Sequence, residues 1–311
     1  MTEPDLGLYR FEEVAGCPSC QAAGFSEVFT RTIRGLPLHF VKCVSCRIIY
    51  QNPRFDAASL DAYFSSDTFV HDDKSSDFDL DELMGYPDYS AWDGDYRTTA
   101  SLRLKRIKSC LPQRGRLLEI GSATGAFLSE ARQEGFTVQG LDISRLFAGI
   151  ARRLNDVNVW VGSVEEYQIP SESFELICSW GGIACWRDPQ KGLANIWQGL
   201  KPGGIFALNH PNVESLPAWL MGKRWFEWNH ASLFIYSNES MERLLRQNGF
   251  RILVSQNERQ VASLARIAMY LKLKKTLALL NKLGLGKWSF PLIVPGTTFR
   301  ICQRIDSKSS S

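Results

Sequence analysis

Eight cysteines are present in the 311-residue chain, and four of them form two C-x-x-C pairs near its beginning. The pairs are separated by 22 residues and consist of Cys17, Cys20, Cys43 and Cys46. Four thiolates can complete a tetrahedral shell around Zn²⁺, and such a closed site stabilises a fold without leaving a position for substrate. A redox dithiol is the alternative, but the pair is duplicated and no thioredoxin-like βαβ pattern follows it. We therefore predict a structural zinc ribbon over residues 12–56.

A glycine-rich turn is the second stretch whose residues could bind a ligand. An apolar run containing Glu119 leads into Gly121 and Gly125, and an amphipathic segment follows. This pattern predicts a strand, a tight loop and a helix, with free backbone amides at the helix start and room for a nucleoside beside the glycines. Asp142 lies 21 residues beyond Gly121, at the end of the next apolar run. A carboxylate in that position can accept hydrogen bonds from both hydroxyls of a ribose.

These residues resemble the first motif of the class I S-adenosylmethionine-dependent methyltransferases, E-x-G-x-x-x-G, followed by an acid at the end of the second strand. The resemblance covers residues 102–257 and continues at 298–304. It implies an α/β fold with a Rossmann-like, seven-stranded, mostly parallel sheet and helices on both faces, built from residues 101–257 and 296–306. Ala123 stands where a dinucleotide motif, G-x-G-x-x-G, would have its second glycine, which argues against a nicotinamide cofactor. A glycine turn in an ordinary α/β domain is the plainer alternative.

The resemblance also implies S-adenosylmethionine as the cofactor and a set of residues that bind it. Glu119 would help to bind the ammonium group and Asp142 the ribose. The other expected cofactor residues are Gly121, Ala123 and Gly125 at the methionine moiety, Ile143 and Val164 on either side of the adenine, Ser163 beside the adenine, and Trp180. Most relatives have an aspartate where Ser163 stands, so Glu165 or a backbone carbonyl is the alternative acceptor for the adenine amino group.

The general base most common in this family is missing. Many relatives carry a Glu-His pair before the helix that follows the fourth strand, whereas this chain has Ala184 and Cys185. A cysteine is a poor base at neutral pH. His230 and His210 are the remaining candidates, and a base is unnecessary for a substrate that is already acidic, such as a phenol, an oxime or a carboxylate.

Aromatic residues dominate the predicted loops at the carboxyl ends of the strands, where α/β sheets bind ligands. They predict an aromatic-walled pocket for a small-molecule acceptor that is itself apolar or aromatic, although such residues often belong to a core. The residues of this expected pocket are Tyr63, Trp186, Trp225 and Trp228. Tyr63 is carried over by resemblance to bacterial small-molecule methyltransferases, including sugar C-methyltransferases, which bear a zinc ribbon ahead of the same fold.

Two further segments have distinctive compositions. Residues 57–100 are acidic and aromatic, and we interpret them as a solvated linker or as a lid over the active site. Residues 258–295 contain seven basic side chains and one acid, Glu258, and predict a basic amphipathic helical insertion before the last strand. Such a segment packs on its own domain, joins a second subunit in a homo-oligomer, or contacts a membrane surface. Residues 307–311 predict a disordered tail.

Composition favours a soluble enzyme over other classes. The formal charge of +3 gives no reason to expect nucleic acid as an obligatory partner, which disfavours an RNA methyltransferase. The first residues lack the apolar core of a signal peptide, and no apolar run approaches the roughly 18 residues that span a bilayer. We therefore expect a cytoplasmic methyltransferase that transfers a methyl group to an O, N or C nucleophile. A non-enzymatic scaffold is the remaining rival, and the Glu119, Gly121, Gly125 and Asp142 set argues against it.

Overall fold

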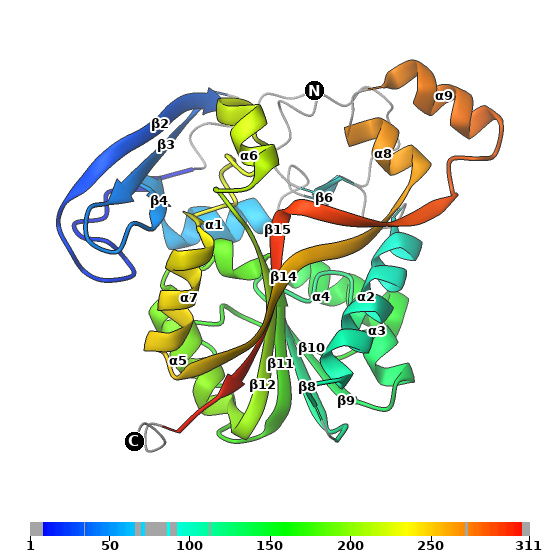
Figure 1. The fold of residues 1–311 in the computed structure, drawn as a ribbon, viewed down its shortest axis with the longest axis horizontal. Coiled ribbons are helices and arrows are strands. Elements are labelled where there is room, and N and C mark those ends of the chain that lie inside the picture. Colours follow the sequence, from blue (N-terminus) through cyan, green and yellow to red (C-terminus); the bar gives the residue numbers. More distant parts are fainter. Residues whose placement is uncertain are drawn as a thin grey trace.

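The computed structural model describes residues 9–33, 35–65, 70–71, 86–87, 92–111, 113–270 and 273–306. A central twisted sheet carries helices on both faces, a smaller antiparallel sheet lies at one upper corner, and a long two-stranded extension leads to the helices at the other (Figure 1).

The central sheet has seven strands in the order β10-β9-β8-β11-β12-β15-β14. Only β15 runs antiparallel to its neighbours, because the other neighbouring strands pair in parallel. This sheet confirms the predicted Rossmann-like, mostly parallel architecture. The strands are β8 (Arg116–Ile120), β9 (Thr137–Asp142), β10 (Val159–Val161), β11 (Phe174–Trp180), β12 (Leu200–Pro211), β14 (Phe250–Ser263) and β15 (Ser289–Arg304).

Helices cover both faces of this sheet, because its strands are apolar on both sides. In β8, the neighbouring residues Leu117 and Leu118 are fully buried in two different hydrophobic clusters, one on each face. α2 and α3 lie over one face, and α5 and α7 over the other (Figure 1). The helices are α2 (Asp93–Lys108), α3 (Ala126–Gln133), α4 (Arg145–Asn155), α5 (Pro189–Gly199) and α7 (Asn238–Gln247).

The zinc-ribbon region is not a separate body. Its strands β2 (Phe25–Ile33), β3 (Leu36–Cys43) and β4 (Ile49–Gln51) form one antiparallel sheet with β13 (Phe234–Ile235), which belongs to the methyltransferase region. The Gln51 side chain also donates hydrogen bonds to the carbonyls of Asn229 and Ser232, at 2.9 and 2.8 Å. Nothing in the sequence suggested this pairing, since a strand of two residues has no detectable period.

A second short ladder connects the ribbon to the first helix. β1 (Phe11–Glu12) pairs with β5 (Arg54–Phe55), and α1 (Ala57–Phe64) follows directly. Asp56 caps α1, since its side chain accepts a hydrogen bond from the Ser59 amide at 2.8 Å.

The predicted helical insertion at 258–295 is only partly helical. β14 and β15 stay paired from Phe250 to Ser263, well past the point where β12 ends, and the helices at their tip are α8 (Leu264–Tyr270) and α9 (Lys274–Lys282). Glu258 anchors the base of this extension, because its buried carboxylate lies 3.2 Å from the Arg103 guanidinium and 2.6 Å from Asn209 Nδ2. The helical pattern in the sequence of residues 258–295 belongs to α8 and α9 alone.

Most of the acidic and aromatic stretch, predicted as a linker or lid, lies outside the described residues, as does the predicted tail. The stretch begins with α1, and its last residues, from Asp93 on, belong to α2. β6 (Val70–His71) and β7 (Tyr86–Pro87) pair in parallel between them. Three short elements follow strands of the central sheet. η3 (Gly182–Ala184) follows β11, and α6 (Leu216–Met221) and η4 (Gly222–Arg224) follow β12. No helix in the described part of the chain is long and apolar enough to span a bilayer.

Candidate active site

A cavity with an empty volume of about 860 Å³, which includes space open to solvent, lies at the carboxyl ends of the parallel strands. Ile120, Asp142 and Trp180, the last residues of β8, β9 and β11, all line it. This is the edge of an α/β sheet where ligands bind. The predicted cofactor residues that line the cavity are Gly121, Ala123, Asp142, Ile143, Ser163, Val164 and Trp180.

The glycine loop is shaped by two positive φ angles. Gly121 has φ +72° and borders the cavity, and a Cβ placed on it would meet nothing within 4 Å. Gly125 has φ +78° and precedes α3, and a Cβ there would lie 2.5 Å from Val157 Cγ2. The first glycine therefore keeps a surface open for a ligand, whereas the second allows the loop to pack against the domain. Gly125 is not among the residues that line the cavity.

Asp142 is held rigidly at the end of β9. Its Oδ2 accepts a hydrogen bond from the Ala123 amide at 2.8 Å and its Oδ1 from the Ser144 amide at 2.9 Å. Burial raises the pKa of this carboxyl to about 6, and the two amides oppose that rise. Each oxygen has a second lone pair that can accept a ribose hydroxyl, so the position fits the expected role.

Glu119 supplies a test of whether the site fits S-adenosylmethionine. Its side chain is buried on β8 behind the residues that line the cavity and is not one of them, and its Oε2 has no hydrogen-bond partner within the described residues. Burial raises the pKa of this carboxyl well above its usual value, although the nearby Arg103 guanidinium favours the charged form. A buried carboxylate oxygen without a partner is costly, and a cationic ligand group such as the methionine ammonium would satisfy it. The residues present therefore fit the cofactor.

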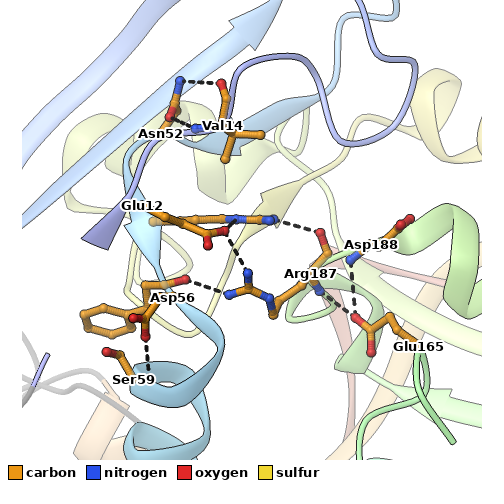
Figure 2. Close-up of polar contacts among 10 residues, drawn as sticks. Glu12, Val14, Asn52, Asp56, Ser59, Glu165, Arg187 and Asp188 are labelled. Atoms are coloured by element: carbon orange, nitrogen blue, oxygen red, sulfur yellow. Dashed lines mark hydrogen bonds and ion pairs between the residues drawn. The ribbon is translucent and has the colours of Figure 1, made fainter. Parts of the chain in front are cut away.

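The expected adenine side of the cavity contains Ile143, Val164, Ser163 and Glu165. Glu165 Oε1 accepts hydrogen bonds from the backbone amides of Arg187 at 2.6 Å and of Asp188 at 3.3 Å (Figure 2). Its second oxygen takes no part in these two bonds.

Two of the predicted tryptophans line the cavity. Trp180 packs edge-on against Phe127, stacks on Phe299 with ring centroids 6.0 Å apart, and lies under the Arg103 guanidinium at 4.3 Å. Trp186 lies further along the same connection, just after η3, and is buried in a hydrophobic core cluster. Packing therefore fixes both rings before any ligand arrives.

The other three predicted pocket residues do not line the cavity. Trp228 packs between Phe29 and Phe40 of the ribbon, with ring centroids 5.5 and 4.9 Å away, and Trp225 packs against Trp228. Tyr63 is buried against aromatic rings of the β1–β5 region. The cause is the docked ribbon, which uses this aromatic surface as its core.

Two residues of α1 that the sequence analysis missed take the place of Tyr63. Leu60 and Phe64 line the cavity and are four residues apart, so they share one helix face. The i, i+4 spacing of these apolar side chains was the available signal.

Both candidate histidines are also absent from the cavity lining. The His230 ring stacks on Phe55 and its Nε2 lies 3.2 Å from the Pro37 carbonyl, while burial lowers its pKa to about 4. His210 is a buried residue of β12 whose Nε2 lies 3.4 Å from Arg300 Nε, and burial lowers its pKa to about 3. Cys185 does line the cavity, but burial raises the pKa of its thiol to about 12.

The four ribbon cysteines form a cluster whose Sγ atoms all lie within 4.8 Å of one another. The Cys17–Cys46 and Cys20–Cys43 sulfur distances are 3.5 and 3.6 Å. Zn–S bonds of about 2.3 Å in a tetrahedron place sulfurs about 3.8 Å apart, so the cluster fits a closed Zn²⁺ site.

A family model described as a methyltransferase domain matches residues 92–255, which is more than half of the chain. The dTDP-4-amino-2,3,4,6-tetradeoxy-D-glucose N,N-dimethyltransferase of Saccharopolyspora spinosa is 30% identical over 146 residues, covering 45% of this chain and 57% of that protein. The malonyl-[acyl-carrier protein] O-methyltransferase of Enterobacter lignolyticus is 30% identical over 141 residues, covering 43% of this chain and 55% of its own. The chain thus spans about half the length of these curated relatives.

A solved structure shows the same fold. It is a presumed methyltransferase from Bacillus halodurans C-125, 14% identical, with a TM-score of 0.50, and the match covers 66% of this chain and 100% of that one. The strand order, the glycine loop with its acidic partners and the matched family model agree. The chain belongs to the methyltransferase domain family, in the S-adenosylmethionine-dependent class that its first motif resembles.

Proposed function

We propose that this protein transfers the methyl group of S-adenosylmethionine to an oxygen, nitrogen or carbon nucleophile of a small, apolar or aromatic acceptor. The observation that carries the proposal is the cavity itself, which is lined by Asp142 and the glycine loop together with Trp186 and the α1 side chains Leu60 and Phe64. When bound, S-adenosylmethionine supplies a methyl group on a sulfonium centre, which a nucleophile takes by in-line displacement.

The protein's contribution would be mainly positional. Glu119 and Asp142 offer carboxylates to an ammonium group and a ribose, and the rings of Trp180 and Trp186 are fixed by packing. Holding two reacting atoms about 3 Å apart and aligned can supply several kcal/mol of the barrier reduction.

The residues around the cavity favour an acceptor that needs no enzymatic base. No histidine is among the described residues that line it, and the Cys185 thiol stays protonated at neutral pH. We therefore propose an acceptor whose nucleophile is already available, such as a carboxylate, an acidic phenol or an unprotonated amine. The names of the two relatives, an O-methyltransferase and an N,N-dimethyltransferase, support testing both carboxylate and amine acceptors.

The test begins with calorimetric titration of the purified protein with S-adenosylhomocysteine, with zinc measured on the same sample by elemental analysis. Micromolar binding and one zinc per chain are expected. Acceptors are then screened by transfer of radiolabelled methyl groups. A folded, zinc-loaded protein that fails to bind S-adenosylhomocysteine would refute the enzymatic proposal and favour the scaffold.

A further inference from the structure

Glu12, Arg54 and Arg187 connect the ribbon to the wall of the cavity. Arg187 Nη2 donates to Glu12 Oε1 at 2.8 Å, and Arg54 Nε donates to the same oxygen at 2.9 Å (Figure 2). The two arginines also bind each other's segments, because Arg187 Nη1 donates to the Phe55 carbonyl at 2.9 Å and Arg54 Nη1 to the Arg187 carbonyl at 2.7 Å. One carboxylate oxygen therefore bridges two partly buried cations.

On the cavity side, this cluster holds the residues that face the ligand. Arg187 and Glu165 both line the cavity, and the Arg187 amide binds Glu165 Oε1 at 2.6 Å. Residues 54–55 lead directly into the capped start of α1, whose Leu60 and Phe64 form another part of the wall. A displacement of residues 54–55 would therefore move two walls of the cavity together.

On the ribbon side, the cluster is attached near the first metal knuckle. Glu12 lies in β1, paired with Arg54, and Val14 is held by Asn52 through both its amide, at 2.9 Å, and its carbonyl, at 3.4 Å (Figure 2). Val14 is three residues before Cys17. The short chain segment from Cys17 to Val14, the bonds between Val14 and Asn52, and the Glu12 carboxylate thus connect the cysteine cluster to the cavity wall.

We infer that Glu12 is a positioning residue, through which the metal-loaded ribbon holds Arg187 and α1 in the arrangement that binds the cofactor. The inference rests on the proposed function, since it deepens the assignment of that cavity. It makes cofactor affinity depend on the zinc ribbon, although no ribbon cysteine lines the cavity.

The central experiment compares S-adenosylhomocysteine affinity in wild type and Glu12→Gln by calorimetry. Glutamine keeps the shape but removes the charge that two guanidinium groups share, and we expect affinity to fall between about twofold and thirtyfold, the usual range for such coupling. Glu13→Gln is the matched control, because Glu13 is the adjacent carboxylate and is exposed. Zinc content and thermal midpoint are measured for each variant, so that metal loss or unfolding cannot account for the change.

A double-mutant cycle separates positioning from a general structural effect. If Glu12 acts through Arg187, Glu12→Gln should change affinity little in an Arg187→Gln background. Chelation of zinc from the wild type should lower affinity at least as far as Glu12→Gln does. Unchanged affinity in folded Glu12→Gln, or additive effects in the cycle, would overturn the inference, whereas a wild type that binds no S-adenosylhomocysteine would refute the proposed function.

A separate observation concerns the surface at the tip of the β14–β15 extension. Residues 259–305 contain no aspartate or glutamate, and seven basic residues fall within 259–296, of which Arg266 is buried. Large apolar side chains are exposed in the same segment, including Leu279 at 56%, Leu283 at 58% and Trp288 at 61%. α6 lies at the same upper end of the molecule and exposes Trp219 and Leu220 (Figure 1).

We propose that this basic, apolar tip docks on a lipid surface with anionic headgroups. Exposed leucines and tryptophans beside lysines are typical of interfacial membrane segments, and each lysine adds attraction to anionic lipid. A second copy of the chain fits less well, because two such tips would bring like charges together. The extension continues past the end of β12, on the cavity side of the sheet, so docking would orient the cavity towards the lipid.

The test is co-flotation of the full chain with phosphatidylcholine vesicles, with and without phosphatidylglycerol. We expect binding to the anionic vesicles that weakens with salt, and at least a tenfold loss in Leu279→Gln/Leu283→Gln. Leu154→Gln is the matched control, since this α4 leucine is also 56% exposed. Absence of flotation, or an equal loss of flotation in the Leu154→Gln control, would overturn the proposal. So would sedimentation data showing that the wild type is a dimer and that the two leucine substitutions make it monomeric.

Discussion

Replacing Asp142 by asparagine should separate the contribution of this carboxylate to cofactor affinity from its effect on the free energy of unfolding. Burial raises its pKa from 3.8 to about 6. At about 1.4 kcal/mol per pKa unit, the ionised side chain lowers the free energy of unfolding by about 3 kcal/mol at neutral pH. Because the folded state holds the proton more tightly than the unfolded state, this cost is absent below about pH 3.8. It grows between pH 3.8 and about 6 and is complete above that value.

Asp142→Asn should therefore remain at least as stable as wild type at pH 7. The change removes the ionisation cost, while one of the amide hydrogen bonds from Ala123 or Ser144 is lost, at a cost of about 1–2 kcal/mol. Cofactor binding should weaken, because each hydrogen bond from a ribose hydroxyl to a charged acceptor contributes about 1 kcal/mol more than one to a neutral acceptor, which is about fivefold in affinity per bond.

The assay pairs urea denaturation at pH 5 and pH 7 with calorimetric titration of S-adenosylhomocysteine. Asp156→Asn is the control, because Asp156 is also an acid at the end of an element but its side chain is 97% exposed. Unchanged affinity in Asp142→Asn would refute the ribose assignment. A variant clearly less stable than wild type at pH 7 would refute the burial argument.

Three other changes test separate parts of the structure. Gly125→Ala should lower the free energy of unfolding by about 2–4 kcal/mol, because it adds a steric clash to a left-handed backbone. Gly121→Ala should lower the free energy of unfolding by only about 1 kcal/mol but should weaken cofactor binding. Equal losses in urea denaturation would contradict this division. Glu258→Gln should cost about 3 kcal/mol in the same assay by leaving partly buried arginines uncompensated, and a neutral result would show that the extension is held otherwise. The pKa values of about 4 and about 3 keep His230 and His210 uncharged above pH 5, so neither should contribute an inflection near pH 6.5 to the kcat profile. Disappearance of such an inflection in His230→Gln would contradict this.

Local patterns were sufficient to predict that Gly121, Ala123 and Asp142 meet at the carboxyl ends of the strands and that the four cysteines form a cluster. Residues such as Glu119, Gly121 and Asp142 lie at strand ends, and parallel strands bring their carboxyl ends together whatever surrounds them. The two C-x-x-C pairs similarly carry their own geometry, because each pair is a tight knuckle and the hairpin between them closes the cluster.

Prediction was weaker where the role of a residue depended on long-range packing. Trp225, Trp228 and His230 have the composition of a pocket wall. Yet Trp228 and His230 pack against a ribbon strand and β5, which lie far away in the sequence, and Trp225 packs on Trp228. Their loop could line a cavity or form a core, and only the position of the ribbon decides between these. The helical period at 264–282 likewise concealed the strands that carry it.

The sequence by itself therefore determined the fold class, the glycine motif and the cysteine cluster, because each depends on residues close together in the chain or at predictable strand ends. Only the tertiary structure decided which aromatic residues face the cavity and how the ribbon is attached. β13 pairs with β4 across about 185 residues, and Glu12 meets Arg187 across 175. Such contacts leave no period or spacing in the sequence, since they are selected by the shape and charge of surfaces that exist only after folding.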